Sequence, residues 1–289
     1  MNEFGPHSDH KKGTIKHFTN FGSNYVLARN IDVWLPEDFN PERSFAVLYM
    51  HDGQNIFDSE NSFKSISWKV NETLSGLIRS EKIRPCIVVG IWNTDKRFHE
   101  YSPLKPFLNN LSPQLDSMAK EIINNTISDD YLKFITQEVK PFIDTTFNTL
   151  RNRDNTFVAG SSMGGLISLY AICEYPEIFG GAACLSTHWP LSLTQYDPLM
   201  FNVIIDYLNV KLPSPQTHKI YFDHGTETLD SLYPPYQSEV DKIMRARGFT
   251  DKSWISKVFK GDEHSEWSWQ NRFYIPATFL LSTSSSPAG

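Results

Sequence analysis

One octapeptide limits the possible folds of this chain more than any other part of its sequence. Residues 158–165 read Val-Ala-Gly-Ser-Ser-Met-Gly-Gly; a β-branched and aromatic run precedes them, and an apolar helical pattern follows and ends before Pro176. This order predicts a buried strand that turns sharply into a helix. Gly160 and Gly164 lie two residues to either side of Ser162, and the absence of a Cβ at both lets the strand and the helix approach each other. We expect the turn to expose the Ser162 hydroxyl, on strained backbone dihedrals, beside the N-terminal amides of the helix.

A serine on such a turn needs a base and an acid, which follow it in the chain order serine, acid, histidine, each after a strand. Residues 219–225 and 254–259 both read as strands that come after Ser162. The second leads to His264, which lies 102 residues beyond Ser162 (264 minus 162). The order therefore predicts Ser162 as the nucleophile and His264 as the general base.

The loop after the first of these strands holds two candidate acids, Glu227 and Asp230. Either carboxylate could reach His264, depending on how the loop turns. We favour Asp230, because Leu229 can pack into the core and leave the shorter carboxylate beside the histidine. Glu227 remains the alternative.

The composition suits one large domain with a substantial core, since the chain has 289 residues, of which 40% are apolar and 13% aromatic. The formal net charge is −6, from 27 basic and 33 acidic residues, and there is no basic stripe, so nucleic acid and anionic membrane surfaces are not expected partners. No apolar run approaches the roughly 18 residues of a membrane span, which predicts a soluble protein. The three cysteines have no metal-ligand spacing, and we expect neither a metal nor an organic cofactor. No pattern selects between a cytoplasmic protein and a mature secreted or periplasmic one, and none indicates an oligomeric state.

Between its ends the chain alternates strand and helix patterns, which predicts an α/β fold with a mostly parallel central sheet and helices on both faces. Further strand patterns lie at 24–35 (an outer antiparallel strand), 45–50, 86–91 and 182–185, and helical patterns lie at 68–80, 129–147, 234–247 and 266–281, the last with a kink or restart at Pro276.

The remaining segments read as irregular. Two long connections, residues 93–128 and 187–218, would meet at the carboxyl ends of the strands, where ligands bind. We expect a single domain over residues 17–281. It would lie between a flexible polar N-terminal segment, residues 1–16, with no apolar signal-peptide core, and a disordered tail, residues 282–289.

Blocks of sequence around the candidate residues carry a family resemblance. They read His-Asp-Gly-Gln-Asn-Ile-Phe-Asp at 51–58, Arg-Phe-His-Glu-Tyr-Ser-Pro at 97–103, Gly-Ser-Ser-Met-Gly-Gly at 160–165 and Glu-His-Ser-Glu-Trp at 263–267. With them the chain resembles the putative-esterase branch of the α/β-hydrolases, which includes esterase D, enterochelin esterases, mycolyltransferases and the family 1 carbohydrate esterases that remove feruloyl or acetyl groups from xylan. The resemblance extends over most of the chain and implies the α/β-hydrolase fold.

The resemblance also implies a serine carboxylesterase that forms an acyl-enzyme on Ser162. The backbone N–H groups of Gln54 and Met163 would form its oxyanion hole, and Gly53 would leave room for the substrate carbonyl. The expected substrate is a small-molecule or carbohydrate ester, either a feruloyl or acetyl ester of a sugar or a short-acyl or aryl ester. A siderophore trilactone and acyl transfer to a second alcohol use the same chemistry and stay open, as does a catalytically silent relative that binds carbohydrate.

Three aromatic side chains are expected to line the substrate pocket. Trp189, Tyr101 and Trp267 follow predicted strands or lie on loops, where a sugar ring or an aromatic acyl group could stack on them. A place in the core is the alternative for each. His51, beside the oxyanion turn, is expected to brace the loop by hydrogen bonds rather than to transfer protons.

Overall fold

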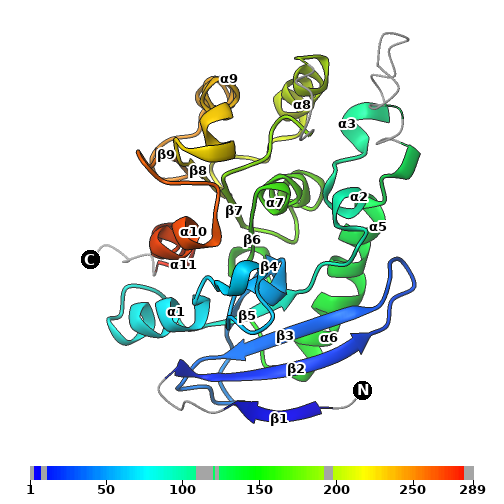
Figure 1. Ribbon diagram of the computed structural model, residues 1–289. Helices are drawn as coiled ribbons and strands as arrows, with labels where there is room; N and C mark the ends of the chain where they lie inside the picture. Colours follow the sequence, from blue (N-terminus) through cyan, green and yellow to red (C-terminus); the bar gives the residue numbers. More distant parts are fainter. Residues whose placement is uncertain (1–2, 8–11, 109–119, 121–123, 192–197, 283–289) are drawn as a thin grey trace.

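A nine-stranded sheet forms the centre of the part of the chain that the structure describes (Figure 1). The computed structural model describes residues 3–7, 12–108, 120, 124–191 and 198–282. The sheet order is β1-β2-β3-β5-β4-β6-β7-β8-β9; the pairs β1–β2, β2–β3 and β3–β5 are antiparallel and the others parallel. The strands are β1 (Glu3–His7), β2 (Thr14–Phe21), β3 (Arg29–Leu35), β4 (Ala46–His51), β5 (Cys86–Ile91), β6 (Thr156–Ser161), β7 (Gly181–Leu185), β8 (Lys219–His224) and β9 (Trp254–Val258).

Helices cover both faces of this sheet (Figure 1). The α-helices are α1 (Val70–Arg79), α2 (Arg97–Tyr101), α3 (Lys105–Leu108), α5 (Ser128–Lys133), α6 (Lys140–Thr146), α7 (Met163–Glu174), α8 (Pro198–Lys211), α9 (Pro234–Ala246), α10 (Glu266–Arg272) and α11 (Tyr274–Leu281). A π-helical segment, η4 (Phe134–Val139), joins α5 to α6, and short 3-10 turns lie at η2 (Gly53–Asn55), η3 (Phe63–Ser65), η5 (Arg153–Asn155) and η6 (Thr228–Leu232). No helix among the described residues combines the length and the apolar character needed to cross a bilayer.

The two faces of the sheet bury two separate apolar cores, because successive side chains of a strand point to opposite sides. In β4, Val47 and Tyr49 lie in the larger core, which also contains the apolar residues of α7 and α9. Leu48 and Met50 lie in the smaller core, with residues of α1, α10 and α11. Every residue of β4, β5, β6 and β7 is buried, as expected for central strands covered on both faces.

The turn from β6 into α7 has the strained geometry that the octapeptide predicts. Ser162 has φ 57° and ψ −123°, a conformation that side-chain-bearing residues rarely adopt. An ideal Cβ on Gly160 would lie 2.7 Å from the backbone carbon and oxygen of Gly164, so the absence of a side chain at Gly160 lets the strand and the helix touch. A Cβ on Gly164 would instead lie 3.3 Å from Asp52 Oδ2 and 3.4 Å from the Cβ of His51, so Gly164 leaves room for the end of β4 and the residue after it rather than for β6.

The N-terminal part of the sheet differs from the sequence-based expectation. The strand predicted at 24–35 is antiparallel but lies inside the sheet, because β2 pairs along its outer side and β1 pairs beyond β2. Residues 1–16, expected to be flexible, contribute β1 and the start of β2. The alternation of β2 is weak because several of its side chains, among them Lys16 and Thr19, are polar and only partly buried.

Two helical predictions also need correction. The connection 187–218, read as irregular, contains the 14-residue helix α8, and the connection 93–128 contains α2 and α3. The C-terminal helical pattern restarts at Tyr274 rather than at Pro276. Pro276 instead lies in the first turn of α11, where the missing N–H costs no helical hydrogen bond. Residues 283–289 of the predicted tail lie outside the described residues.

Gly160→Ala should destabilise the protein, because the added Cβ would meet backbone atoms of Gly164 that cannot move without separating β6 from α7. The expected loss is about 2 kcal/mol or more of the free energy of unfolding. Gly76→Ala in α1 is the matched control, since a Cβ there meets nothing within 4 Å, and it should raise that free energy by about 0.5–1 kcal/mol. Urea denaturation measures both, and equal effects of the two substitutions would contradict the account.

Candidate active site

A pocket of about 500 Å³ opens at the carboxyl edge of the sheet, where β4 and β6 end. It contains three of the residues predicted from the sequence, Ser162, His264 and Gln54. We call it the Ser162 pocket. It is lined by His51, Asp52, Gln54, Asn55, Ile56, Asn61, Ser62, Phe63, Trp68, Asn93, Arg97, Ser161, Ser162, His264, Glu266 and Trp269.

The backbone of Ser162 is fixed to the neighbouring strand β7 and the loop after it. Its N–H donates to the carbonyl of Leu185 at 2.9 Å, and its carbonyl accepts the N–H of His188 at 3.1 Å. Met163 is the first residue of α7, so its N–H is among the helix amides that have no acceptor within the helix. The positive end of the helix dipole therefore faces the Ser162 side of the pocket.

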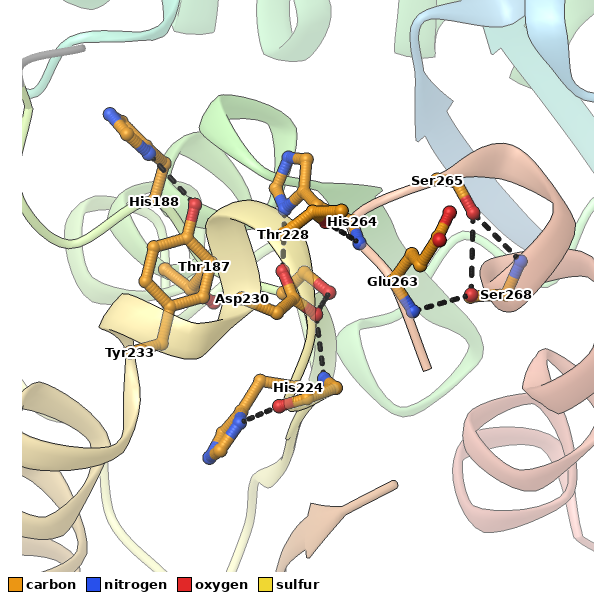
Figure 2. A network of polar contacts seen from close by, with 12 residues as sticks. Thr187, His188, His224, Thr228, Asp230, Tyr233, Glu263, His264, Ser265 and Ser268 are labelled. Carbon is orange, nitrogen blue, oxygen red and sulfur yellow. Dashed lines mark hydrogen bonds and ion pairs between the residues drawn. The ribbon is translucent and has the colours of Figure 1, made fainter. Parts of the chain in front are cut away.

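Asp230 is the carboxylate that the structure brings to His264 (Figure 2). His264 Nδ1 and Asp230 Oδ1 are 2.5 Å apart, and the backbone N–H of His264 donates to Thr228 Oγ1 at 2.9 Å. Leu229 packs against the larger core, as the sequence argument requires. Glu227 instead accepts a hydrogen bond from its neighbour, the Thr226 hydroxyl, at 3.1 Å, and that contact is exposed.

The surroundings of Asp230 favour its ionised form. Burial alone would raise the pKa of this carboxyl, but hydrogen bonds from His264, the Ser186 hydroxyl and the Gly225 N–H outweigh burial and hold its pKa below the ordinary value. Oδ2 accepts from Ser186 Oγ and from the Gly225 N–H, both at 2.6 Å. Since Oδ1 faces His264, each carboxylate oxygen has an assigned partner.

The turn after β4 carries the second predicted part of the site. Asp52 has φ 56°, and the next three residues form η2, which brings Gln54 to the pocket wall. The side chain of Arg97 pairs with both carboxylate oxygens of Asp52 at 2.7 Å, and Asn93 Nδ2 donates to Asp52 Oδ1 at 2.6 Å. Burial raises the pKa of Asp52, but Arg97 and Asn93 outweigh it and lower the pKa. The strained turn is thus fixed by a charge-assisted pair.

Gly53 has a different role from the one expected. We predicted that a Cβ there would obstruct the substrate carbonyl. In the structure an ideal Cβ would lie 2.4 Å from the backbone carbon of Gly90, so Gly53 is needed for the close approach of η2 to β5.

His51 braces this turn, as expected. Its Nδ1 lies 2.8 Å from the hydroxyl of Tyr131, and its side chain is buried. Burial lowers the pKa of His51 to about 3, while Asp52 opposes and Arg97 reinforces that shift. His51 is therefore neutral near neutral pH.

The three aromatic residues predicted to bind substrate do not line the Ser162 pocket. Tyr101 is fully buried, and its hydroxyl accepts the backbone N–H of Asp52 at 3.3 Å, so it supports the turn from behind. Trp189 packs in the core against Phe201 of α8, the helix that the sequence reading missed, at 6.3 Å between ring centroids. Trp267, on α10, is 60% exposed and is not among the residues that line the pocket.

Other aromatic side chains form the pocket wall instead. Trp269 lies two residues after Trp267, which turns it by about 200° around the helix and brings it to the opposite face. Its ring packs edge-on against the His264 ring, with 5.0 Å between centroids, and lies tilted against the Trp68 ring, with 5.5 Å between centroids. Helical periodicity over 266–272 could have distinguished the two tryptophans. Phe63 of η3, whose side chain is 60% exposed, adds a third aromatic side chain to the lining.

Comparisons with known sequences point to esterases. The sequence model of the Putative esterase family matches residues 27–275. Uncharacterized protein YbbA of Bacillus subtilis is 21% identical over 244 residues, which are 82% of this chain and 86% of the relative. An endo-1,4-beta-xylanase/feruloyl esterase of Xylanibacter ruminicola is 25% identical over 183 residues, which are 62% of this chain and 22% of that longer protein.

Solved structures share the fold. A ferulic acid esterase has a TM-score of 0.65 and 17% identity, with 92% of this chain and 97% of that chain covered. The enterobactin esterase FES from Shigella flexneri has a TM-score of 0.66 and 18% identity, with 92% of this chain and 59% of that chain covered. At these identities the likeness shows the fold alone, and the fold is that of the α/β-hydrolases.

His51→Gln should make the stability of the protein less sensitive to acid. Because the folded-state pKa of about 3 lies below the unfolded value of about 6.5, only the unfolded chain takes up this proton at intermediate pH. The free energy of unfolding therefore falls as pH drops from about 6.5 towards 3, by up to about 1.4 kcal/mol per pH unit from this residue. Urea denaturation of both proteins between pH 7 and 4 should show a shallower decline for the variant. Parallel declines would show that His51 does not carry this dependence.

Proposed function

The chain belongs to the Putative esterase family, and from this premise we propose that it is a serine carboxylesterase that works through an acyl-enzyme on Ser162. The observation that carries the proposal is the contact of Asp230 with His264, which lines the same pocket as Ser162. A strained serine at a helix N-terminus, a histidine and a buried carboxylate together supply a nucleophile, a base and an orienting acid.

In the proposed reaction the Ser162 oxygen attacks the ester carbonyl carbon while His264 takes the hydroxyl proton. Asp230 holds the imidazole by its Nδ1–H, which leaves Nε2 as the basic atom, and stabilises the imidazolium. The N–H groups of Met163 and Gln54 would stabilise the carbonyl oxygen as it becomes negative. His264 then protonates the leaving alcohol, and it activates a water molecule that releases the acid from Ser162.

The pocket wall favours an uncharged ester with an aromatic or sugar part. Trp68 and Trp269 provide aromatic surface, and amide side chains such as Asn61 can pair with hydroxyl groups. Among the described residues that line the pocket, Arg97 is the one permanent cation, and Asp52 neutralises it. A feruloyl or acetyl ester of a carbohydrate, or a short-acyl or aryl ester, fits this wall better than a polyanionic siderophore trilactone does.

Ser162→Ala should reduce kcat for 4-nitrophenyl acetate by about 10⁴-fold or more, because the proposed acyl-enzyme forms on the Ser162 hydroxyl. A fluorophosphonate should label the unsubstituted protein at Ser162, as read by peptide mass spectrometry, and should not label the variant. A folded variant that keeps its activity would contradict the assignment of the nucleophile. An unsubstituted protein inactive on every ester tried would favour the silent carbohydrate-binding alternative.

The two candidate acids should separate clearly in kinetics. Asp230→Asn is expected to lower kcat by roughly 10³- to 10⁴-fold, since the imidazole loses its orientation and its counter-charge. Glu227→Gln is the matched control and should cost less than about tenfold, because Glu227 bonds to Thr226 at the surface. The reverse order would transfer the role to Glu227.

A substrate panel should identify the ester. We expect kcat/KM for methyl ferulate, acetylated xylan or 4-nitrophenyl acetate to exceed that for enterobactin by about tenfold or more, because the one cation in the described lining, Arg97, is already paired with Asp52 and is not free for an anionic chelate. A higher kcat/KM for enterobactin would show that a siderophore trilactone, and not a carbohydrate or aryl ester, is the preferred substrate. A transfer product formed in the presence of a second alcohol would point to acyl transfer.

A further inference from the structure

Ser186 lies directly behind the proposed triad and has no part in the mechanism described so far. It follows the last residue of β7, has φ 41° and is fully buried. Its backbone N–H donates to the carbonyl of Asp223 at 2.8 Å, which ties it to the end of β8. Its side chain lies between Asp230 and helix α10.

The Ser186 oxygen makes three hydrogen bonds, and their directions are fixed by chemistry. Trp269 Nε1 lies 2.9 Å away, and Arg272 Nη2 lies 2.8 Å away. An indole N–H and a guanidinium can only donate, so these two groups occupy both lone pairs of the hydroxyl oxygen. The single Ser186 proton is left for Asp230 Oδ2, at 2.6 Å.

From this inventory we propose that Ser186 is a positioning residue for the triad, one that holds Asp230 Oδ2 so that Oδ1 faces His264. The proposal rests on the proposed function, since it assigns a role relative to that reaction. Ser186 joins three elements that are far apart in sequence: the end of β7, the turn η6 and helix α10. A rotation of the Asp230 carboxylate away from His264 would break the bond to Ser186 as well as the bond to the Gly225 N–H.

Ser186 also separates Asp230 from the buried guanidinium. Arg272 Nη2 is 3.8 Å from Asp230 Oδ2, beyond hydrogen-bond distance, while Arg272 bonds to Asp223 at 2.9 Å and to Asp262 at 2.8 Å. A direct bidentate pair with Arg272 would draw the negative charge of Asp230 away from the histidine. A neutral hydroxyl in between leaves more of that charge facing His264.

Ser186→Ala should therefore lower kcat by about 10- to 100-fold and leave KM within about twofold, because the hydroxyl does not line the pocket. The decrease of kcat/KM at low pH should move to higher pH by about half a unit. The Asp230 carboxylate, without the hydrogen bond from Ser186, would stabilise the protonated form of the imidazole more strongly. The other charged groups near the pair, Arg272, Asp223, Asp262 and Glu266, are unchanged in the variant. Turnover is expressed per site titrated with a fluorophosphonate, so that unfolded protein does not count.

Two further variants separate positioning from stability. Ser186→Gly also removes the hydroxyl but relieves the strain of a positive φ, so it should show the same kinetic defect with a smaller loss of thermal stability. Ser102→Ala deletes another fully buried hydroxyl, which donates to the Phe98 carbonyl at 2.7 Å, and should lower stability without changing kcat or the pH profile. If both Ser186 variants keep the kcat and pH profile of the unsubstituted enzyme, the serine is merely structural.

This outcome is distinguishable from failure of the proposed function. If the unsubstituted protein is inactive and is not labelled at Ser162, the proposed esterase function is wrong. An active protein that depends on Ser162 and Asp230 but is indifferent to Ser186 would overturn the positioning role alone.

Discussion

The contact between β6 and α7 at Gly160 and Gly164 is the constraint on which the rest of the site depends. Because two backbones touch there, the chain must reverse within one residue, and Ser162 takes a positive φ. The same residue is bonded through its N–H and its carbonyl to the end of β7 and the loop beyond. The central strands of the sheet thus set the position of the serine, and the loops at the other strand ends are placed relative to it.

Buried charges hold those loops where regular structure does not. Asp52 with Arg97 fixes the turn after β4, and Asp223 with Arg272 ties the end of β8 to α10. Removing one partner of such a pair leaves an uncompensated buried charge, which costs several kcal/mol. Asp230 differs in that it takes neutral donors on one oxygen and His264 on the other. The nearest guanidinium, that of Arg272, is 3.8 Å from Asp230 and forms its hydrogen bonds with Asp223 and Asp262 instead, so Asp230 is hydrogen-bonded to His264 and to neutral donors.

The aromatic residues show the limit of reading a surface from sequence. Trp267 and Trp269 are two positions apart on one helix, and only their angular separation tells which reaches the pocket. Trp189 looked accessible because α8, the helix that packs over it, has little amphipathic pattern among its apolar residues. Tyr101 follows a polar stretch, yet it is buried, and its hydroxyl accepts a hydrogen bond from the backbone N–H of Asp52. In each case the neighbour that decides exposure comes from a distant segment.

By itself the sequence determined the strand, turn and helix around Ser162, the chain order of serine, acid and histidine, and the parallel α/β architecture. These depend on local backbone geometry and on the short-range periodicity of apolar residues, which a linear pattern records. Only the tertiary structure decided that Asp230 rather than Glu227 touches His264, that Gly53 packs on Gly90, and that Ser186 stands behind the carboxylate. Those outcomes depend on contacts between residues 34 to 44 positions apart, whose meeting is set by how strands and helices pack and not by any one segment.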